Sequence, residues 1–258
     1  MSIIQRTSAI ILAAGKGTRL NSGQPSAMPK VMYKICGKPM LEYTLKTLEN
    51  INILDIVIVV GYKAEMVKKY FGDKYKYALQ KEQKGTGHAV SCAEKTADLT
   101  NDNVLVIQGD DSAFYSPATL IDLITSHVQD KAKVSLLTLM HKHPAELGRI
   151  IRDKKGRIIA IKEKEVLTDR ERKIKEINTG TYCFKADWLW KNIKKLKPSS
   201  TGKGELILPD LIKIAVEQGE MVSGHVIKKE EEWVGVNNPD QLKFANEAMT
   251  KRGWKCDV

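Results

Sequence analysis

The chain has 258 residues, of which 42% are hydrophobic and 28% are charged, so it can bury the core of one large α/β domain. This composition excludes the disordered and fibrous classes, and no stretch reaches the roughly 18 consecutive apolar residues of a membrane helix. With no secretory leader pattern at the amino end, we expect a cytoplasmic protein. The formal net charge of +11 favours an anionic partner, which could be nucleic acid, an acidic membrane surface or a small polyphosphate.

The first half of the chain alternates predicted strands and helices. Residues 8–14 form a continuous apolar run, typical of a strand buried on both faces, and a glycine loop follows at 15–17. The next expected elements are helix 39–48, strand 55–60, helix 64–71, strand 75–79, a helix opening near 85–89, strand 104–107, helix 117–127 and strand 133–138. Such alternation predicts a largely parallel sheet with helices on both sides and a ligand crevice at the carboxyl ends of its strands. Gly15, Gln80 and Asp110 all follow such ends.

The second half begins with a different pattern. From about residue 147 it indicates a hairpin, with strands 148–152 and 157–162 around the turn 153–156. The charged run 162–175 is expected to be a loop or an exposed helix. Further along we expect strand 179–184, helices 186–196 and 205–218, strand 221–227 and a closing helix 239–249. With no internal repeat and no proline-rich linker, this half is expected to complete the same domain.

The loop after the first strand has features of a phosphate site. Residues 12–19, LAAGKGTR, place two glycines and a cation where successive N–H groups can point at one anion. The loop is not a Walker A motif, and Leu20 stands where a dinucleotide fingerprint needs Gly or Ala. Arg19 and Lys30 flank the polar segment 21–29, which looks like a flexible flap. They could clamp a triphosphate and neutralise charge as pyrophosphate leaves, or they could be ordinary surface cations.

Cysteine and histidine patterns do not predict a zinc site. The four cysteines are far apart and form no C-x-x-C pair, so we expect reduced thiols. His141 and His143 have no Cys or carboxylate nearby to complete a metal site, and two loop histidines are more often solvated. His88 follows a Gly-Thr-Gly turn and is expected to orient that loop rather than act as a base.

Eight sequence blocks stand in one order between Leu12 and about Asn246: LAAGKGTRL (12–20), PKVM (29–32), GKPML (37–41), QKEQKGTGHAV (80–90), GDD (109–111), LGRIIRD (147–153), EINTG (176–180) and GVNN (235–238). Together they resemble the bacterial N-acetylglucosamine-1-phosphate uridyltransferase family, specifically the pyrophosphorylase domain of the bifunctional enzyme. The resemblance implies an α/β fold of the Rossmann-like, glycosyltransferase-A type, with a mostly parallel mixed sheet flanked by helices. It implies a single nucleotidyltransferase domain over residues 1–258, with a nucleotide-binding half at about 1–140 and a sugar-binding half at about 141–250.

The activity implied by the resemblance is transfer of a uridylyl group from UTP to N-acetylglucosamine 1-phosphate, which yields UDP-N-acetylglucosamine and pyrophosphate with the help of Mg²⁺. Alternatives with the same fold are dTTP or UTP with glucose 1-phosphate, and CTP with a polyol phosphate. A catalytically silent sugar-nucleotide sensor is another alternative. A nucleic-acid-binding protein is a further alternative, but the basic residues are scattered among acids, so neither nucleic acid nor a membrane is the expected partner.

The resemblance also implies a role for each matched residue. Arg19 and Lys30 would be catalytic, and Asp110 and Asn237 would bind Mg²⁺, a metal that prefers oxygen ligands. The nucleotide would be bound by Leu12, Ala13, Gly15, Gly17, Thr18, Gln80, Gly85 and Thr86. The sugar would be bound by Gly109, Gly148, Glu163 and Asn178. Plainer readings stay open, because Asp110 could cap the next helix and Asn178 and Asn237 could be turn residues.

Several features depart from the family pattern. Gln108 precedes Gly109 where an aromatic residue is expected, and Leu147 precedes Gly148 where Tyr is expected. The 21–29 flap looks long, and the doubled acid at 110–111 leaves a choice between two carboxylates, of which the motif favours Asp110. No hexapeptide-repeat β-helix is visible, so we expect no acetyltransferase domain, and the pattern predicts no oligomeric state.

Overall fold

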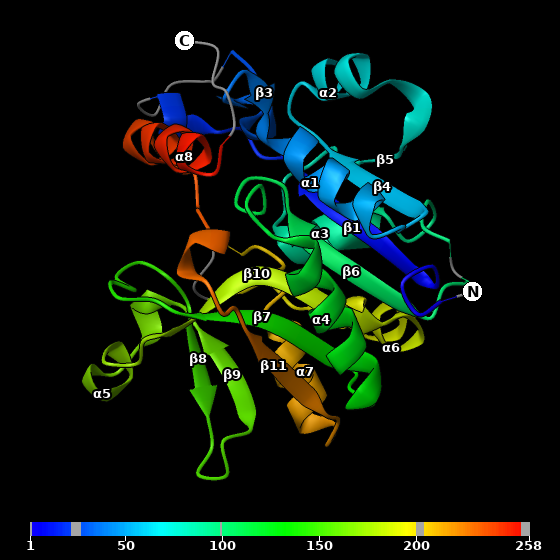
Figure 1. Ribbon diagram of the computed structural model, residues 1–258. Helices are drawn as coiled ribbons and strands as arrows, with labels where there is room; N and C mark the ends of the chain where they lie inside the picture. The colour runs from blue at the N-terminus through cyan, green and yellow to red at the C-terminus, as the bar shows by residue number, and fades with distance from the viewer. Residues whose placement is uncertain (1, 22–26, 99, 200–203, 254–258) are drawn as a thin grey trace.

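The computed structural model describes residues 2–21, 27–98, 100–199 and 204–253. Its centre is a sheet with the strand order β11-β7-β10-β6-β1-β4-β5 (Figure 1). These strands span Thr7–Ala13 (β1), Asp55–Val60 (β4), Lys76–Leu79 (β5), Asn103–Gln108 (β6), Val134–Met140 (β7), Glu176–Lys185 (β10) and Val222–Val226 (β11). All neighbours on this path pair in parallel except β10, which is antiparallel to both β6 and β7. The expected α/β fold with a mostly parallel mixed sheet is confirmed.

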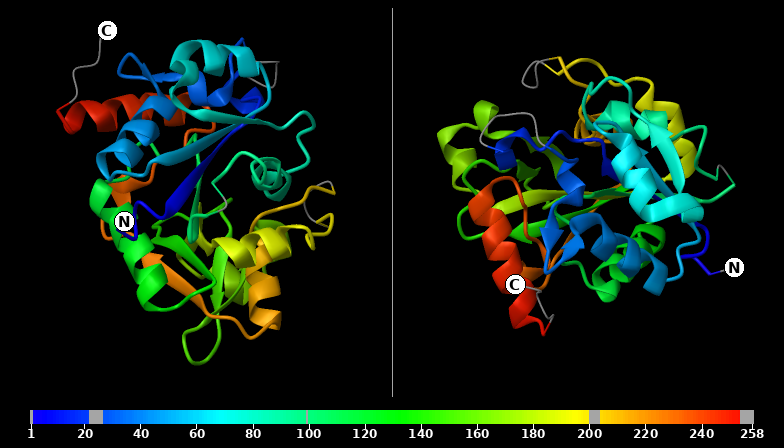
Figure 2. Two further views of the ribbon diagram at one scale, coloured as in Figure 1. Left: turned by 90° about the vertical axis from the view of Figure 1, so that its right-hand side faces the viewer. Right: turned by 90° about the horizontal axis from the view of Figure 1, so that it is seen from above.

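Helices cover both faces of the sheet because the inner strands are apolar on both sides. Every residue of β1 is buried, with even positions such as Ile10 facing one core cluster and odd positions such as Ile11 facing the other. The first cluster contains residues of α3 (Thr86–Cys92), α6 (Ala186–Ile193) and α7 (Asp210–Glu217). The second contains residues of α1 (Met40–Asn50), α2 (Ala64–Phe71) and α4 (Pro117–Gln129). In the left view of Figure 2, α1 and α4 lie on one side of the strands and α6 and α7 on the other.

A third core cluster joins the last helix to the first part of the chain. Helix α8 (Pro239–Lys251) packs on a small hairpin of β2 (Lys34–Ile35) and β3 (Lys38–Pro39), which the sequence did not predict. The backbone N–H of Cys36, between the two strands, donates to Asn246 Oδ1 at 2.8 Å. Because α8 is held against this hairpin, the segment just before α8 lies close to the loop after β1.

Most predicted elements have a counterpart within a few residues, and two boundaries differ. The hairpin is formed by β8 (Arg149–Arg152) and β9 (Ile158–Lys162), and the charged run contains the short helix α5 (Asp169–Arg172). The helix predicted from residue 205 begins at Asp210, because the backbone of Leu206 instead bonds to Lys84 and Gly87. β10 begins before the predicted strand because Glu176–Asn178 also pair with β7. Short 3-10 helices span Thr18–Asn21 (η1), Lys30–Met32 (η2), Gly72–Lys74 (η3), Lys164–Val166 (η4) and Glu230–Glu232 (η5).

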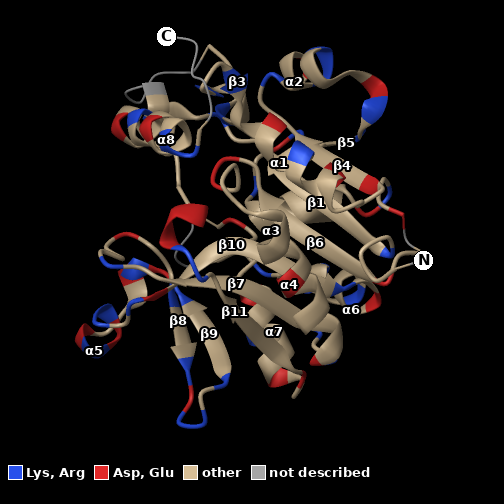
Figure 3. Ribbon diagram, viewed as in Figure 1, with Lys and Arg blue, Asp and Glu red and all other residues tan. Residues whose placement is uncertain are grey.

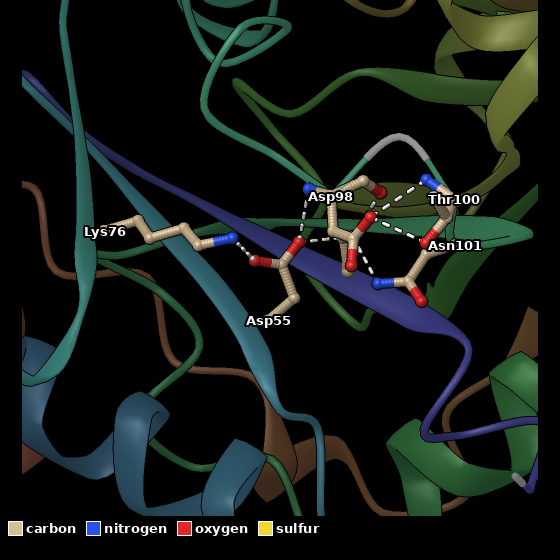
Figure 4. A network of polar contacts seen from close by, with 6 residues as sticks. Asp55, Lys76, Asp98, Thr100 and Asn101 are labelled. Carbon is tan, nitrogen blue, oxygen red and sulfur yellow. Dashed lines mark hydrogen bonds and ion pairs between the residues drawn. The ribbon is translucent and has the colours of Figure 1, made fainter.

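A buried carboxylate organises the amino-terminal end of the parallel strands, away from the loops that follow them (Figure 4). Asp55 is 8% exposed and accepts hydrogen bonds from Ser8 Oγ at 2.6 Å and the Asp98 backbone N–H at 2.8 Å. Lys76 Nζ lies 2.7 Å from its other oxygen. Because a buried charge is stable only when it is paired and hydrogen-bonded, these contacts fix how β1, β4 and β5 begin.

Two other expectations concern the chain as a whole. Within the described residues, none of the helices has both the length and the hydropathy of a membrane span. Cys92 and Cys183 are free thiols, whereas Cys36 is disulfide-bonded, so the expectation of reduced cysteines was wrong for Cys36. Cys256 lies outside the described residues, as do residues 22–26 of the predicted flap.

Candidate functional site

The loops that follow four parallel strands meet at the carboxyl edge of the sheet. Backbone hydrogen bonds join them: Gly109 N donates to Leu12 O at 3.0 Å, and Gln80 N donates to Val60 O at 2.8 Å. A cavity of about 230 Å³ opens there. It is lined by Leu12, Ala14, Gly15, Lys30, Val31, Gln80, Gln83, Gly85, Thr86, Ala89, Gln108, Asp110 and Glu205. Seven of the predicted site residues therefore line one cavity.

Two cations, a carboxylate and an amide form a cluster beside this cavity. Lys30 Nζ contacts Asp110 Oδ2 and donates to Asn237 Oδ1 at 2.8 Å, and Arg19 Nη2 donates to the same Asn237 oxygen at 3.0 Å. The Lys30 side chain is 12% exposed. Gly17 packs on Lys30, because a Cβ at Gly17 would lie 3.2 Å from Lys30 Cβ. The structure thus brings together the glycine loop, both predicted cations and both predicted metal ligands.

Of the two neighbouring acids, Asp110 is the one that faces the cluster. Asp111 Oδ1 is buried without a hydrogen-bond partner. Burial, reinforced by the neighbouring Asp110 carboxylate, raises the pKa of Asp111 well above its usual range. The nearby helix caps are other residues, since Ser116 caps α4 and Asn238 caps α8. Neither Asp110 nor Asn237 is therefore used as a helix cap.

The Gly-Thr-Gly turn at the start of α3 is shaped by the backbone of residues 204–208. Gly85 has φ +98°, and a Cβ there would lie 2.5 Å from Leu206 O. Thr86 Oγ1 accepts a hydrogen bond from Leu208 N at 2.9 Å. This turn also holds Gln80, because Gln80 Nε2 donates to Gly85 O at 3.0 Å. The same nitrogen lies 3.1 Å from His88 Nδ1. His88 therefore contacts the cavity residue Gln80, whereas the sequence predicted that it would orient the Gly-Thr-Gly loop.

The predicted sugar-binding residues form a second group. A Cβ at Gly148 would lie 3.2 Å from Glu163 Oε1, and Asn178 N donates to Gly148 O at 3.0 Å. Burial, with Glu165 and Asp210 nearby, raises the pKa of Glu163. The Asn178 amide is engaged within the protein, since Oδ1 accepts from Gly180 N and Nδ2 donates to the Tyr182 hydroxyl. Asn178 thus lies in β10 rather than in a turn, although its bond to Gly180 N is of the kind that Asn forms in turns.

Gly180 connects this second group to the cavity. A Cβ at Gly180 would lie 2.9 Å from Gln108 Cγ, and Gln108 lines the cavity. Gln108 was noticed in the sequence only as a departure from an aromatic residue. Its amide forms no hydrogen bond with any described residue, so it is available to a bound molecule.

Three predicted residues contribute in other ways, and six cavity residues were not predicted: Ala14, Val31, Gln83, Ala89, Gln108 and Glu205. The Ala13 side chain lies in the apolar core, Thr18 is exposed, and Gly109 is buried between β1 and Val31. Gln83 lies in the 80–90 block but was assigned no role there, and Glu205 lies outside the motif blocks. Gln83 Nε2 donates to Ala14 O at 2.8 Å and so fixes the carbonyl that precedes the glycine loop. Glu205 lies in the segment that packs against the Gly-Thr-Gly turn, which could not be inferred from periodicity.

The donor set of the cluster fits a hard divalent cation. The carboxylate of Asp110 and the amide oxygen of Asn237 both reach one ammonium nitrogen, so a single cation can touch both. A metal that retains waters and binds phosphate oxygens needs no more protein ligands than these two. Elsewhere in the described ranges, no three His, Cys, Asp or Glu side chains gather as metal ligands. His141 instead packs edge-on against Trp233.

A larger cavity of about 690 Å³ lies between α1, α8 and η5, lined among others by Tyr43, Phe114, Phe244 and Arg252. None of the predicted site residues lines it. Cavity size alone therefore does not locate the site. The site is located by the polar groups that converge at the carboxyl ends of the strands.

Residues 8–252 match the family described as Nucleotidyl transferase. The chain belongs to this nucleotidyl transferase family. It is 38% identical over 244 residues to the Bifunctional protein GlmU of Bacillus licheniformis, and 41% identical over 244 residues to that of Limosilactobacillus fermentum. Each alignment covers 95% of this chain and 52% of the relative, so the chain spans about half the length of these curated relatives.

Among solved structures, this nucleotidyl transferase resembles a Bacillus anthracis protein assigned as a glucose-1-phosphate thymidylyltransferase and crystallised with a sucrose. The TM-score is 0.78 at 23% sequence identity, and the match covers 98% of this chain and 96% of that one. This likeness supports the fold.

Proposed function

We propose that this chain transfers a uridylyl group from UTP to N-acetylglucosamine 1-phosphate, forming UDP-N-acetylglucosamine and pyrophosphate. The observation that carries the proposal is the contact of Lys30 with both Asp110 and Asn237 at the rim of the cavity that holds Gln80 and Thr86. The identity to the GlmU proteins and the eight motif blocks support this substrate pair. In this proposal one domain provides both halves of the site, with residues 1–140 binding the nucleotide and 141–250 the sugar phosphate.

Proteins of this family act on nucleoside triphosphates and sugar phosphates and use a divalent metal. We assign Mg²⁺ to this chain, with Asp110 and Asn237 as its protein ligands. When bound, the metal would draw negative charge away from the triphosphate. Arg19 and Lys30, which stand on the glycine-loop side of the same cluster, would stabilise the charge that builds on the departing pyrophosphate.

The reaction needs no protein nucleophile. A phosphate oxygen of the sugar 1-phosphate forms a bond to the α-phosphorus of UTP, and the bond from that phosphorus to the oxygen bridging to the β-phosphate breaks. The electron pair leaves with pyrophosphate. Because the attacking oxygen is already ionised at neutral pH, positioning and charge neutralisation supply most of the acceleration.

The arrangement around Gln80 favours a uracil base. The Gly85 carbonyl can only accept a hydrogen bond, so the amide nitrogen of Gln80 must face it, and its second hydrogen faces His88 Nδ1. Gln80 Oε1 contacts no donor among the described residues and is left to accept from a ligand. Uracil offers an N–H donor at its N3 position, which this oxygen matches.

The sugar would lie between Gln108 and the pair formed by Gly148 and Glu163. Glu163 accepts hydrogen bonds from hydroxyl groups as a carboxylate and can donate one when protonated, a form that its raised pKa favours. Gln108 adds an amide that can both donate and accept. Gly148 keeps the carboxylate open on one side, because a side chain there would touch it.

The test is a panel of UTP, dTTP, CTP and ATP, each with N-acetylglucosamine 1-phosphate, glucose 1-phosphate and a polyol phosphate, in the presence of Mg²⁺. Pyrophosphate release measures turnover, and mass spectrometry identifies the product. We expect the highest kcat/KM for UTP with N-acetylglucosamine 1-phosphate. A higher value for another pair would replace the assigned substrates, and no turnover with any pair would remove the proposed reaction.

A further inference from the structure

The side chain of Lys30 stands between the two residues that we assign to the metal. Its ammonium contacts Asp110 Oδ2 and donates to Asn237 Oδ1 at 2.8 Å. These are the same oxygens that a divalent cation would need. A cation at this position and the Lys30 ammonium cannot use both oxygens together, since like charges a few ångströms apart repel strongly in a partly buried site.

The surrounding chain holds Lys30 in this position. Its backbone N–H donates to Gly15 O at 3.3 Å, and Gly17 packs against its Cα and Cβ. The next residue, Val31, is 2% exposed and anchors η2 in the core. The base of the side chain is thus fixed, while its four-carbon stem can rotate the ammonium towards another anion. The cavity lined by Lys30 and Gly15 is where the triphosphate is proposed to bind.

Arg19 does not fill the same position. Among the described residues it reaches Asn237, at 3.0 Å, and it is exposed in η1, just after the glycine loop. The Asp110 carboxylate, which carries the negative charge of the site, is paired with Lys30. Removal of Lys30 therefore frees the Asp110 oxygen and leaves Asn237 Oδ1 bonded only to Arg19, whereas removal of Arg19 leaves the Lys30 ammonium on both oxygens.

We propose that Lys30 acts as an internal competitor of the metal: in the nucleotide-free protein its ammonium occupies the cation position, and the phosphates of the nucleotide draw it away. This inference rests on the proposed metal ligands Asp110 and Asn237. It makes metal binding and nucleotide binding mutually dependent, so that the protein binds the free metal weakly and takes up metal and triphosphate as a pair. Lys30 would then alternate between two anionic partners during each turnover.

The experiment measures the binding of Mn²⁺ alone, without nucleotide, from the electron paramagnetic resonance signal of the free ion. The variants are Lys30→Met and Lys30→Gln, which remove the charge and keep a side chain of similar length. The matched control is Lys16→Met, in the same loop, because the exposed Lys16 side chain forms no hydrogen bond or ion pair with the described residues. Circular dichroism establishes that each variant is folded before the titration.

We expect both Lys30 variants to bind Mn²⁺ at least tenfold more tightly than the unmodified protein, and Lys16→Met to bind it within twofold. Equal affinity of the unmodified protein and the folded Lys30 variants would overturn the inference, as would an equal gain in Lys16→Met, which would show a general charge effect. The double variant Lys30→Met with Asp110→Ala should lose the gain. If the double variant keeps the gain, the metal does not use Asp110, and the inference fails together with the ligand assignment. Uridylyl transfer by the unmodified protein is measured separately, so that failure of the proposed function can be told apart from failure of this inference.

Discussion

Lys30 Nζ and Asn237 Oδ1 lie 2.8 Å apart, although 207 positions separate the two residues in the chain. The contact joins the segment after the first strand to the segment just before the last helix. Asp110, which follows β6, completes the group from the middle of the sequence. A site built from three distant segments makes specific demands on each residue, and these demands can be measured.

The carboxylate at position 110 is expected to be essential for turnover. We predict that Asp110→Asn lowers kcat at least about 100-fold, because a group that stabilises transition-state charge typically contributes about 3 kcal/mol. Arg19→Ala should lose activity to a similar extent. Both variants should stay folded, since Asp110 and Arg19 are partly exposed and lie outside the core. Steady-state kinetics with unfolding curves would check this.

The matched control for Asp110→Asn is Asp111→Asn, in which the neighbouring buried acid becomes an amide of similar shape. Because the raised pKa of Asp111 already favours its neutral form, this change should alter kcat less than tenfold. If Asp111→Asn were the inactive variant and Asp110→Asn the active one, the two acids would have to exchange roles.

Gln80 is expected to discriminate between pyrimidine bases. Its free Oε1 can accept from the N3 hydrogen of uracil, whereas cytosine presents a lone pair there. We therefore predict that kcat/KM for UTP exceeds that for CTP by at least about 100-fold, because a buried acceptor left unpaired is costly. In Gln80→Ala the preference should fall below about tenfold. Gln83→Ala, which removes an amide bonded to Ala14 O instead, should keep it. Discrimination that survives in Gln80→Ala would assign base recognition to other groups.

Gly85 is predicted to tolerate no side chain, for two reasons that can be separated. Its φ of +98° is strained for alanine, and its missing Cβ leaves room for Leu206 O. Gly156 has φ +78° with nothing within 4 Å, so Gly156→Ala measures the cost of a positive φ without a clash, about 1 kcal/mol, whereas Gly85, with ψ 175°, has a conformation that non-glycine residues rarely adopt. Gly85→Ala should cost about 3 kcal/mol, because the clash adds to the strain. Urea unfolding of both variants gives the difference, and equal costs would show that residues 204–208 move away freely.

His127 is expected to make stability depend on pH. Burial, followed by the positive charge of Lys185, lowers its pKa from 6.5 to about 4 in the folded protein. The unfolded chain therefore binds more protons than the folded one between these values. The stabilising contribution of neutral His127 is present above pH 6.5 and is lost as the pH falls towards 4, by up to about 1.4 kcal/mol per pH unit.

The comparison that isolates this effect is the unmodified protein against His127→Gln, each unfolded by urea at several pH values. The difference in their free energies of unfolding should shrink as the pH is lowered through this window. The variant removes only the titration of residue 127 and leaves the other titrating groups in both proteins. A constant difference from pH 7 to pH 4 would mean that His127 is protonated as readily in the folded protein as in the unfolded chain.

The elements that the sequence predicted well are those set by local pattern. β1, β4 and β6 are continuous apolar runs, and their order with the intervening helices is that of a parallel sheet. The antiparallel insertion of β10 was not predicted, because the pairing of a strand depends on partners far away in sequence. The hairpin of β2 and β3 was missed because two-residue strands have no measurable periodicity.

The site residues likewise fall into those that local sequence pattern located and those that depend on distant contacts. Gly15, Gln80 and Asp110 could be located from their positions at strand ends, and the structure brings all three to one cavity. Asn237 follows no strand, and its position depends on how α8 packs, so only the resemblance indicated it. Glu205 could not be found, since its place in the cavity depends on the backbone contact between Leu206 and the turn at Gly87.

Figure 3 shows Lys and Arg interspersed with Asp and Glu over the surface helices, including α5 and α8. The basic residues that give the net charge of +11 are thus spread along the chain among acidic residues. At the site, by contrast, two cations share Asn237, and one of them also pairs with Asp110. This arrangement suits a compact polyphosphate better than an extended polyanion.

The packing of α8 on the β2–β3 hairpin means that the site is assembled in a fixed order as the chain is made on the ribosome. When translation has reached η5, the glycine loop, Lys30 and Asp110 have already been made, but Asn237 has not. The pocket can then accommodate a base without being able to complete the cation position. The proposed cation position would be complete only after Asn237 and α8 have been made and have packed against residues from the beginning of the chain.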